Sequence, residues 1–432
     1  MPERRTYFCI DMKSFYASVE CAERGLDPFE TNLAVVDVNR GKNAICLAIT
    51  PKMKSLGIKN RCRLADIPRD VKYIVAPPRM ALYIDYAADI YGVYLNYISQ
   101  NDIHVYSIDE AFLDVTNYLE RYGMDAVTFA KFLMKEIEKC CHVPSTAGIG
   151  TNLYLAKIAL DITAKRAKDR VGYLDEELYR ETLWDHRPIT DFWMVASGTA
   201  RRLERYGVYD MRGVAHLPEK TLYSTFGINA ELLIDHAWGR EPCLISDIKK
   251  YKSKSRSVSF SQILPKNYTF DQARTVMKEM ALNGAAELMK RKVITPRVSI
   301  FVGYSLDEIP PTGGSTRLEV TTALSSFIME AALRLYDKTT VRDRMIRRLG
   351  IGFGDVHDES CEGYSLFVDE KAVEKERKVQ QTVLELRRKY GKNAVLNGVN
   401  FLGESTQRER NSFIGGHRAG GAVQAGIQNR SG

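Results

Sequence analysis

The chain has 432 residues, of which 45% are hydrophobic and 27% are charged. At roughly 150 residues per domain, this length predicts about three domains with buried cores and excludes a wholly disordered chain. No run of about 18 uncharged apolar residues is present, so we expect a cytoplasmic protein without a membrane segment. The eight cysteines form no C-x-x-C pair, which favours free thiols. The net charge of +8 is compatible with a polyanionic partner if the basic residues cluster.

The first ~165 residues alternate between strand and helix patterns, which predicts an α/β domain. The expected strands are 6–11, 33–38, 44–49, 104–108, 111–115 and 145–149. The expected helices are 14–22, 50–57, 80–98, 125–141 and 152–165. Residues 39–43 read as the basic tip of a hairpin. Strand ends that carry acidic residues invite a search for a site.

From about residue 172 to 238, prolines and glycines separate short helical patterns, which predicts a small all-helical domain. An exposed basic linker is expected next, because five basic residues fall within eight positions that hold no acid: Lys249, Lys250, Lys252, Lys254 and Arg256. Strands at 256–261, 297–304, 315–320 and 345–353, with helices at 270–291 and 322–336, predict an open sheet covered by two helices.

A charged helix is expected from Glu370 to Tyr390, and a Gly-rich tail follows it. The apolar residues of that helix allow two interpretations, since the helix could pack on the body of the protein or bind a partner. The Gly-rich end is expected to be disordered because it has too little apolar surface to bury.

Three acidic residues stand where predicted strands end or meet. Asp11 ends the first strand, and Asp109 and Glu110 lie between two later strands. Carboxylates that converge at one sheet edge bind hard divalent cations. Two such ions about 4 Å apart activate an attacking hydroxyl and neutralise a leaving phosphate. Solvated turn residues are the alternative, because spacing alone does not show that residues about 98 positions apart meet.

Three segments carry a specific resemblance to a known family. They are Asp11–Glu20 (DMKSFYASVE), Tyr106–Asp114 (YSIDEAFLD) and Gly148–Ala159 (GIGTNLYLAKIA). In order and spacing they resemble the polymerase-domain signatures of the Y-family (UmuC/DinB-type) translesion DNA polymerases. The resemblance covers about residues 1–420 and is closest to the branch found in Gram-positive bacteria and their mobile elements.

The resemblance implies a right-hand polymerase of mixed α/β and α+β domains. Its parts would be a palm (1–12 and 77–166), fingers (13–76), a helical thumb (167–238), a basic linker (239–252), a little finger domain (253–356) and a C-terminal tail (357–432). It also implies a monomeric, template-dependent DNA polymerase that adds dNTPs to primer–template DNA. Such an enzyme would act in translesion synthesis with low fidelity and without a proofreading domain.

The resemblance assigns roles to residues of the first motif and to the acidic pair. Asp11, Asp109 and Glu110, with the backbone carbonyl of Met12, would hold two Mg²⁺ ions, and Glu110 would help to activate the primer 3′-hydroxyl. Tyr16 falls at the family's aromatic steric gate, which rejects a ribose 2′-hydroxyl by clash. A core tyrosine of an amphipathic helix is the alternative. Phe15 would offer backbone amide contacts to the triphosphate.

Two lysines are expected at the triphosphate, where an ammonium acts as a point charge. Lys54 matches the basic residue of the fingers, although Pro51 replaces the tyrosine often found one turn earlier. Ala164 stands where the family keeps a palm lysine, so Lys165 is assigned in its place. Lys157 is interpreted as a structural or template-side residue. The alternative for Lys157 and Lys165 is a surface position without a role.

Contacts with the DNA backbone are expected from the thumb, the linker and the little finger. Thumb residues 191–208 resemble a helix-hairpin-helix, whose amides bind a DNA phosphate. Met194 and Ala196 replace the usual glycines and tolerate positive φ poorly, which predicts a weak grip or one through Arg201 and Arg202. A plain packing motif, or a solvated strand edge in the little finger, is the alternative. The other expected backbone contacts are Lys250, Lys252, Lys254, Arg256 and Arg297.

Gly363–Phe367 resembles the bacterial sliding-clamp binding peptide, with Tyr364, Leu366 and Phe367 as apolar anchors. A peptide that docks back on its own protein is the alternative. For the whole chain, a catalytically silent DNA- and clamp-binding regulator is the second hypothesis, and the intact acidic set argues against it. A palm-type nucleotidyl cyclase is the third, and it would need neither a basic linker nor a clamp-like peptide.

Overall fold

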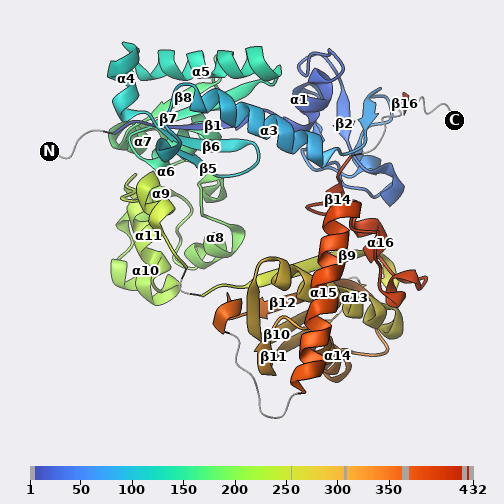
Figure 1. The fold of residues 1–432 in the computed structure, drawn as a ribbon. Helices are drawn as coiled ribbons and strands as arrows, with labels where there is room; N and C mark the ends of the chain where they lie inside the picture. The colour runs from blue at the N-terminus through green and yellow to red at the C-terminus, as the bar shows by residue number, and fades with distance from the viewer. Residues whose placement is uncertain (1–4, 254, 306–308, 362–368, 421–425, 428–432) are drawn as a thin grey trace. The chain divides into compact units, whose positions relative to one another are not determined.

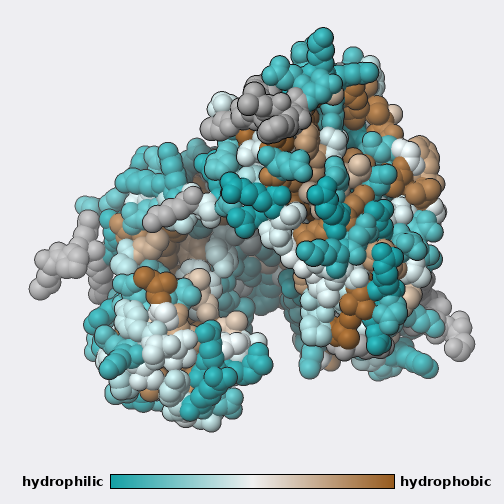
Figure 2. Space-filling view, turned by 90° about the horizontal axis from the view of Figure 1, so that it is seen from below, coloured by the Kyte–Doolittle hydropathy of each residue, from teal (hydrophilic) through white to brown (hydrophobic). Residues whose placement is uncertain are grey.

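The structure is a computed structural model that describes residues 5–253, 255–305, 309–361, 369–420 and 426–427. The chain forms two compact units, unit 1 from Met1–Tyr251 with Ala419–Gly432 and unit 2 from Lys252–Arg418. No helix in the described ranges is both long and apolar enough to cross a bilayer. On the face drawn in Figure 2, hydrophilic residues cover most of the surface and hydrophobic residues form small separate patches.

A five-stranded sheet in the order β5-β6-β1-β7-β8 forms the centre of unit 1. Its strands are β1 (Tyr7–Met12), β5 (Ile103–Val105), β6 (Glu110–Asp114), β7 (Ser145–Gly150) and β8 (Val171–Leu174). Its helices include α3 (Met80–Leu95), α4 (Thr116–Tyr122), α5 (Ala126–Cys141) and α6 (Leu153–Ile158), which continues as a π-helical turn, Ala159–Ala164. Figure 1 shows α3 and α5 on one side of this sheet and α6 on the other.

Two glycines of β7 let α6 pack directly on the strand. A Cβ atom at Gly148 would lie 2.2 Å from the carbonyl oxygen of Ala156, and one at Gly150 would lie 2.2 Å from the amide nitrogen of Ala156. Real Cβ atoms do not come so close to backbone, so only glycine fits at these two positions. The Gly-Ile-Gly part of the third motif is therefore a packing requirement that fixes α6 against β1 and β7.

Strand β8 corrects the sequence-based expectation of an all-helical region from residue 172. Val171–Leu174 pairs in parallel with β7, so the sheet continues past the predicted palm boundary at 166. A strand of four residues has little periodicity of its own, and its pairing partner lies more than twenty residues earlier in the chain. Local pattern alone could not identify it.

The region predicted as the fingers contains most of a second, smaller sheet. It consists of β2 (Leu33–Val35), β3 (Ala48–Ile49), β4 (Ile74–Ala76) and β16 (Gly426–Ile427) in the order β16-β4-β2-β3, with helices α1 (Phe15–Ala22) and α2 (Pro51–Ser55). The predicted hairpin is present as an antiparallel β2–β3 pair, but it is shorter than expected because residues 38–40 form a 3-10 turn. The short helix α2 is confirmed, with Thr50 as its N-cap and Gly57 at φ 80° after its end.

Five α-helices follow β8 and share one hydrophobic core with α6 and β8: α7 (Glu176–Leu183), α8 (Ser197–Glu204), α9 (Met211–His216), α10 (Glu219–Phe226) and α11 (Asn229–Ala237). The expected exposed linker is wrong in its first half, because Ile245–Lys250 forms helix α12. Ile245 is buried among Tyr7, Phe112 and Leu153, so burial of apolar area holds this basic segment on the central sheet.

Unit 2 has the predicted open sheet with two helices. Strands β9 (Val258–Tyr268), β10 (Val293–Tyr304), β11 (Thr312–Thr322) and β12 (Ile346–Gly354) pair in the order β11-β10-β12-β9, and β13 (His357–Asp358) pairs with β10. Helices α13 (Phe270–Lys290) and α14 (Ser325–Thr339) pack together and share one core with the sheet. The predicted order of these elements is confirmed, and three of the four strands are longer than expected.

The segment after the sheet is folded rather than disordered where the structure describes it. Helix α15 (Glu370–Tyr390) has the predicted bounds. It is followed by α16 (Gln407–Arg410), β14 (Phe413–Ile414) and β15 (His417–Arg418). The buried Glu279 of α13 accepts hydrogen bonds from Asn400 Nδ2 at 2.6 Å, from Thr406 N at 3.0 Å and from the Ser405 hydroxyl. This carboxylate anchors residues 400–406 on unit 2.

Candidate active site

The three acidic residues meet where β1 ends and β6 begins. The antiparallel register places Asp11 directly opposite Glu110. The Met12 amide donates to the Asp109 carbonyl at 2.9 Å, and the Ser107 hydroxyl donates to Asp109 Oδ1 at 2.6 Å. The pairing of two strands that are distant in sequence therefore brings together the acids that the sequence singled out.

The Asp11 carboxylate lies in an electrostatically unfavourable place for an anion. Its pKa is raised to about 7, chiefly because the group is buried and then because Asp109 and Glu110 are close. Negative charge that converges in a partly desolvated place favours a bound cation, and carboxylate oxygens are the donors that Mg²⁺ prefers. Within the described ranges, however, no three His, Cys, Asp or Glu side chains already form a ligand group for a metal ion.

Lys157 of α6 accounts for the position of Glu110. Its ammonium lies 2.7 and 2.8 Å from the two Glu110 carboxylate oxygens and 3.1 Å from Asp161 Oδ2. The Cys9 thiol also donates to Glu110, at 3.1 Å. Burial alone would lower the pKa of Lys157, but Cys9, Glu110 and Asp161 outweigh it and raise that pKa.

Sequence reasoning missed this role, since it took Lys157 as structural or template-side. The signal available was a lysine inside the otherwise apolar run of residues 153–160, four positions before Asp161. A charge at that position is buried, and a buried charge requires a partner. The identity of the partner, Glu110, depends on how α6 packs on β1 and β7.

Tyr16 lies beside the acidic residues in the first turn of α1. Its ring centroid is 5.5 Å from that of Phe15 and 4.8 Å from that of Tyr83. Tyr16 is half-buried, whereas Phe15 is buried. Burial, and then the negative charge of Asp109, raise the pKa of the Tyr16 hydroxyl. Tyr16 is thus partly open to solvent beside the acidic residues, whereas a core tyrosine would be fully buried.

Cationic side chains gather near Asp11. Desolvation lowers the pKa of Lys54, and Lys13 and Lys165 lower it further, while Asp11 opposes them. The pKa of Lys13 is lowered in the same way by burial and by Arg170 and Lys165. Lys165 is exposed and binds Asp161 Oδ1 at 3.0 Å. Lys13 and Arg170 were not predicted, and the signal for Lys13 was its place two residues after Asp11.

The thumb hairpin adopts the turn that its sequence was expected to resist. Met194 has φ 67°, in the left-handed region, although it is not glycine. Arg201 is exposed on α8. Arg202 instead donates to the carbonyls of Gly198 and Thr225, both at 3.3 Å, and its guanidinium lies over the Phe226 ring. Arg201 and Arg202 are both exposed, and Arg202 makes contacts within its own domain.

The predicted DNA-contact residues of the linker and unit 2 differ in their secondary structure and in their contacts. Lys250 is the exposed last residue of α12, and Lys252 and Arg256 are exposed in irregular backbone. Arg297 on β10 forms an ion pair with Asp355 at 3.4 Å. The remaining predicted contact residues lie outside the described residues, namely Lys254 and the clamp-peptide residues Tyr364, Leu366 and Phe367.

One face of the unit 2 sheet is lined by small residues. The register aligns Ser259, Gly352, Ser299 and Ser315 across four strands. The three serines are exposed or half-buried, and Arg297 and Arg317 pair in the neighbouring row. Hydroxyl groups with cations on a flat surface suit hydrogen bonds to a phosphate backbone.

Comparison with known proteins shows which family the chain resembles. The model of the impB/mucB/samB family matches residues 10–161, and the model of that family's C-terminal domain matches residues 252–366. UvrX of Bacillus subtilis (strain 168), which is named for a proposed part in UV-damage repair, is 30% identical over 423 residues, which cover 96% of this chain and 98% of UvrX. DNA polymerase IV 2 of the same strain is 28% identical over 426 residues, which cover 96% of this chain and 100% of that protein.

A solved structure agrees with these sequence matches. A Y-family DNA polymerase chimera of Dbh and Dpo4 matches with a TM-score of 0.64 at 21% sequence identity, over 82% of this chain and 99% of the chimera. At this identity the match concerns the fold, and it confirms the expected multidomain α/β architecture. The family resemblance of the sequence motifs is confirmed by all these matches. The chain belongs to the impB/mucB/samB family of Y-family DNA polymerases, in its Gram-positive branch.

Proposed function

We propose that this DNA-directed DNA polymerase carries out translesion synthesis. It would extend a primer with dNTPs opposite damaged or undamaged template, with low fidelity and without a proofreading domain. The observation that carries the proposal is the meeting of Asp11, Asp109 and Glu110 at one end of the central sheet. The names of two relatives, DNA polymerase IV 2 and the UV-damage repair protein UvrX, support it.

The acidic residues are proposed to hold two Mg²⁺ ions together with the Met12 carbonyl. The raised pKa of Asp11 supports this assignment, because a cation would relieve the repulsion that raises it. When bound, the ions would supply charge stabilisation and activation of the primer 3′-hydroxyl for in-line attack. Lys157 neutralises one carboxylate charge and orients Glu110, which is the proposed acceptor of the hydroxyl proton.

The lysines beside Asp11 are proposed to bind the dNTP triphosphate. Lys54 and Lys165 are the predicted pair, and Lys13, a further cation near Asp11, is proposed as a third. The Phe15 amide would contact the triphosphate, and Tyr16 would lie against the sugar. Positioning and fixed charge supply most of the acceleration in such phosphoryl transfers.

Contacts with the DNA backbone are proposed for basic residues of the predicted thumb, the linker and unit 2, and they would make binding weaken steeply with salt. They are Arg201, Lys250, Lys252, Lys254, Arg256 and Arg297. The monomeric state and the sliding-clamp contact through residues 364–367 are further parts of the proposal, and they rest on the sequence. A catalytically silent DNA- and clamp-binding regulator is the competing function.

Primer extension tests the proposal. We expect the wild type to extend a primer on undamaged and abasic templates with Mg²⁺ and dNTPs at low salt. The variant Asp109→Ala/Glu110→Ala should not extend it, because two of three carboxylates are lost. Glu176→Ala/Glu177→Ala is a matched control, since it removes an adjacent acidic pair of the same unit, in the first turn of α7.

The possible results separate the hypotheses. Equal extension by the wild type and the Asp109/Glu110 variant would refute the site. No extension by the wild type, even at low salt with a sliding clamp present, would favour the silent regulator.

A further inference from the structure

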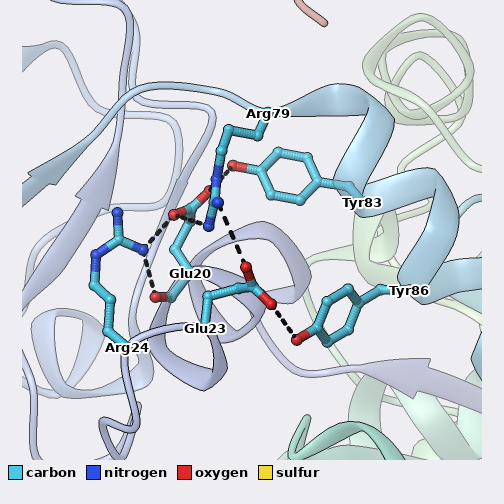
Figure 3. Close-up of polar contacts among 6 residues, drawn as sticks. All are labelled: Glu20, Glu23, Arg24, Arg79, Tyr83 and Tyr86. Atoms are coloured by element: carbon cyan, nitrogen blue, oxygen red, sulfur yellow. Dashed lines mark hydrogen bonds and ion pairs between the residues drawn. The ribbon is translucent and has the colours of Figure 1, made fainter. Parts of the chain in front are cut away.

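A buried polar network lies behind Tyr16 and joins α1 to the start of α3. At its centre, the Glu20 side chain is fully buried and accepts hydrogen bonds from Arg79 Nε at 2.8 Å and Arg79 Nη2 at 2.9 Å. The Tyr83 hydroxyl donates to Glu20 at 2.8 Å, and Arg24 also donates to this carboxylate. Figure 3 shows Arg79 and Tyr83 converging on Glu20. We call these four residues the Glu20 network.

Tyr83 connects this network to the site. Its ring is fully buried, and its centroid lies 4.8 Å from that of Tyr16, with an interplanar angle of 40°. Its hydroxyl is fixed by Glu20, so both the ring and its polar end are held. Tyr16 is only half-buried, and its ring rests on Tyr83 and Phe15. Tyr83 therefore limits how far the Tyr16 ring can move away from a bound sugar.

We infer that Tyr83, held by Glu20 and Arg79, is a positioning residue that sets how strongly the enzyme rejects ribonucleotides. The inference rests on the proposed function, in which Tyr16 lies against the sugar of the dNTP. Rejection by clash depends on the exact place of the blocking ring, because repulsion between atoms changes steeply with distance. A Tyr16 ring without its support could retreat and admit a 2′-hydroxyl.

The ratio of kcat/KM for an rNTP to that for the matching dNTP measures directly how strongly the enzyme rejects ribonucleotides. We expect Tyr83→Leu to raise the ratio about tenfold or more, which corresponds to about 1.4 kcal/mol of lost discrimination. Tyr83→Phe keeps the ring but removes its anchor, so a rise of a few fold is expected. If Tyr83→Leu does not fold, Tyr83→Phe alone still tests whether Tyr83 affects the rejection of ribonucleotides.

Tyr86 offers a matched control on the same helix. Its hydroxyl donates to Glu23 at 2.9 Å, so Tyr86→Phe removes a hydrogen bond between a tyrosine and a carboxylate one turn away, at a more exposed position (Figure 3). We expect Tyr86→Phe to leave the nucleotide ratio unchanged. A purely structural role of Tyr83 would lower the melting temperature and both kcat/KM values together, without changing their ratio.

Tyr16→Ala separates the inference from the function on which it rests. If Tyr16→Ala relaxes sugar selection and the Tyr83 variants do not, the inference is wrong and the role of Tyr16 stands. If Tyr16→Ala leaves the ratio unchanged, the proposed role of Tyr16 fails, and the inference fails with it. Relaxed selection in Tyr16→Ala and in the Tyr83 variants, with Tyr86→Phe unchanged, supports both.

Discussion

At the scale of single residues, Lys157 has the largest effect on the acidic site. Among the described residues it is the one lysine or arginine that is buried, and its side chain and that of Glu110 are each 9% exposed. An ammonium among carboxylates offsets part of the charge that a metal ion would otherwise neutralise. Lys157 therefore stabilises the site without metal and orients one of its proposed ligands.

Replacement of Lys157 by methionine should make the stability of the protein depend on metal. In EDTA we expect a loss of about 3 kcal/mol, because Glu110 and Asp161 lose a buried partner. Mg²⁺ should restore part of this loss in Lys157→Met, since an ion that binds only the folded state stabilises it. Melting temperatures with and without Mg²⁺ provide the measurement.

Lys165→Met is the control for that experiment. Lys165 also binds Asp161, but its side chain is 56% exposed, so its loss should change stability little in either condition. If Lys157→Met lowers the melting temperature equally with and without Mg²⁺, Lys157 does not affect the stability that metal binding gives.

The acids and Tyr16 could be predicted from sequence, whereas Lys157 and Lys13 could not. Asp109 and Glu110 stand in a motif whose order and spacing are themselves informative. The importance of Lys157 comes from Glu110, which is 47 positions away in the chain. That contact exists only after α6 packs on the glycines of β7. Long side chains at such positions take their role from tertiary structure rather than from local sequence.

At the scale of elements, the Glu20 network is the link between α1 and α3. Burial on its own would raise the pKa of Glu20, but hydrogen bonds from Arg79, Tyr83 and Arg24 outweigh it and lower that pKa. A carboxyl group whose pKa is lower in the folded state stabilises the fold when ionised. This stabilisation is present above the pKa of Glu20 in the unfolded chain and is lost as pH falls through the folded-state value.

Glu20→Gln should therefore destabilise the protein in a pH-dependent way. At pH 7 we expect a loss of about 3 kcal/mol, because Arg79 loses its buried carboxylate partner and keeps only Glu23, at 3.4 Å. The difference from the wild type should begin to shrink as the pH falls below the pKa of Glu20 in the unfolded chain, about 4.3, and should disappear as the pH falls through the lower pKa of the folded protein. Denaturant unfolding at several pH values checks this. A difference that does not vary with pH would show that packing, rather than charge, accounts for the effect.

The elements differ in how far local sequence determines them. Helix α15 has the predicted bounds, since its caps and charged surface are local features. Strand β8 and helix α12 were missed, because the first forms by pairing with β7 and the second by burying Ile245 against the central sheet. Both elements are short, so their hydrophobic periodicity is too weak to predict them. The glycine in β8 and the lysines in α12 favour a loop or linker instead.

At the scale of the whole molecule, the boundary of unit 2 differs from the domain that the family resemblance suggested. The expected little finger ends at residue 356, but the compact unit runs from Lys252 to Arg418. The Ser325 and Ser326 hydroxyls of α14 donate to Glu376 of α15, at 2.6 and 2.7 Å. Glu279 holds residues 400–406 in the same way. The tail is thus an integral part of this unit.

A fragment of residues 252–418 should therefore fold on its own, whereas 252–356 should be less stable by several kcal/mol. The shorter fragment loses the hydrogen bonds of Glu279 and leaves that carboxylate beside an apolar core without partners. Denaturant unfolding of both fragments gives the comparison. Glu279→Ala in 252–418 should lower the free energy of unfolding by part of the difference between the two fragments. Glu409 is an exposed acid on α16, so Glu409→Ala should not lower it. Equal stability of the two fragments would mean that the tail rests on the sheet domain without supporting it, and that the family domain alone is the folding unit.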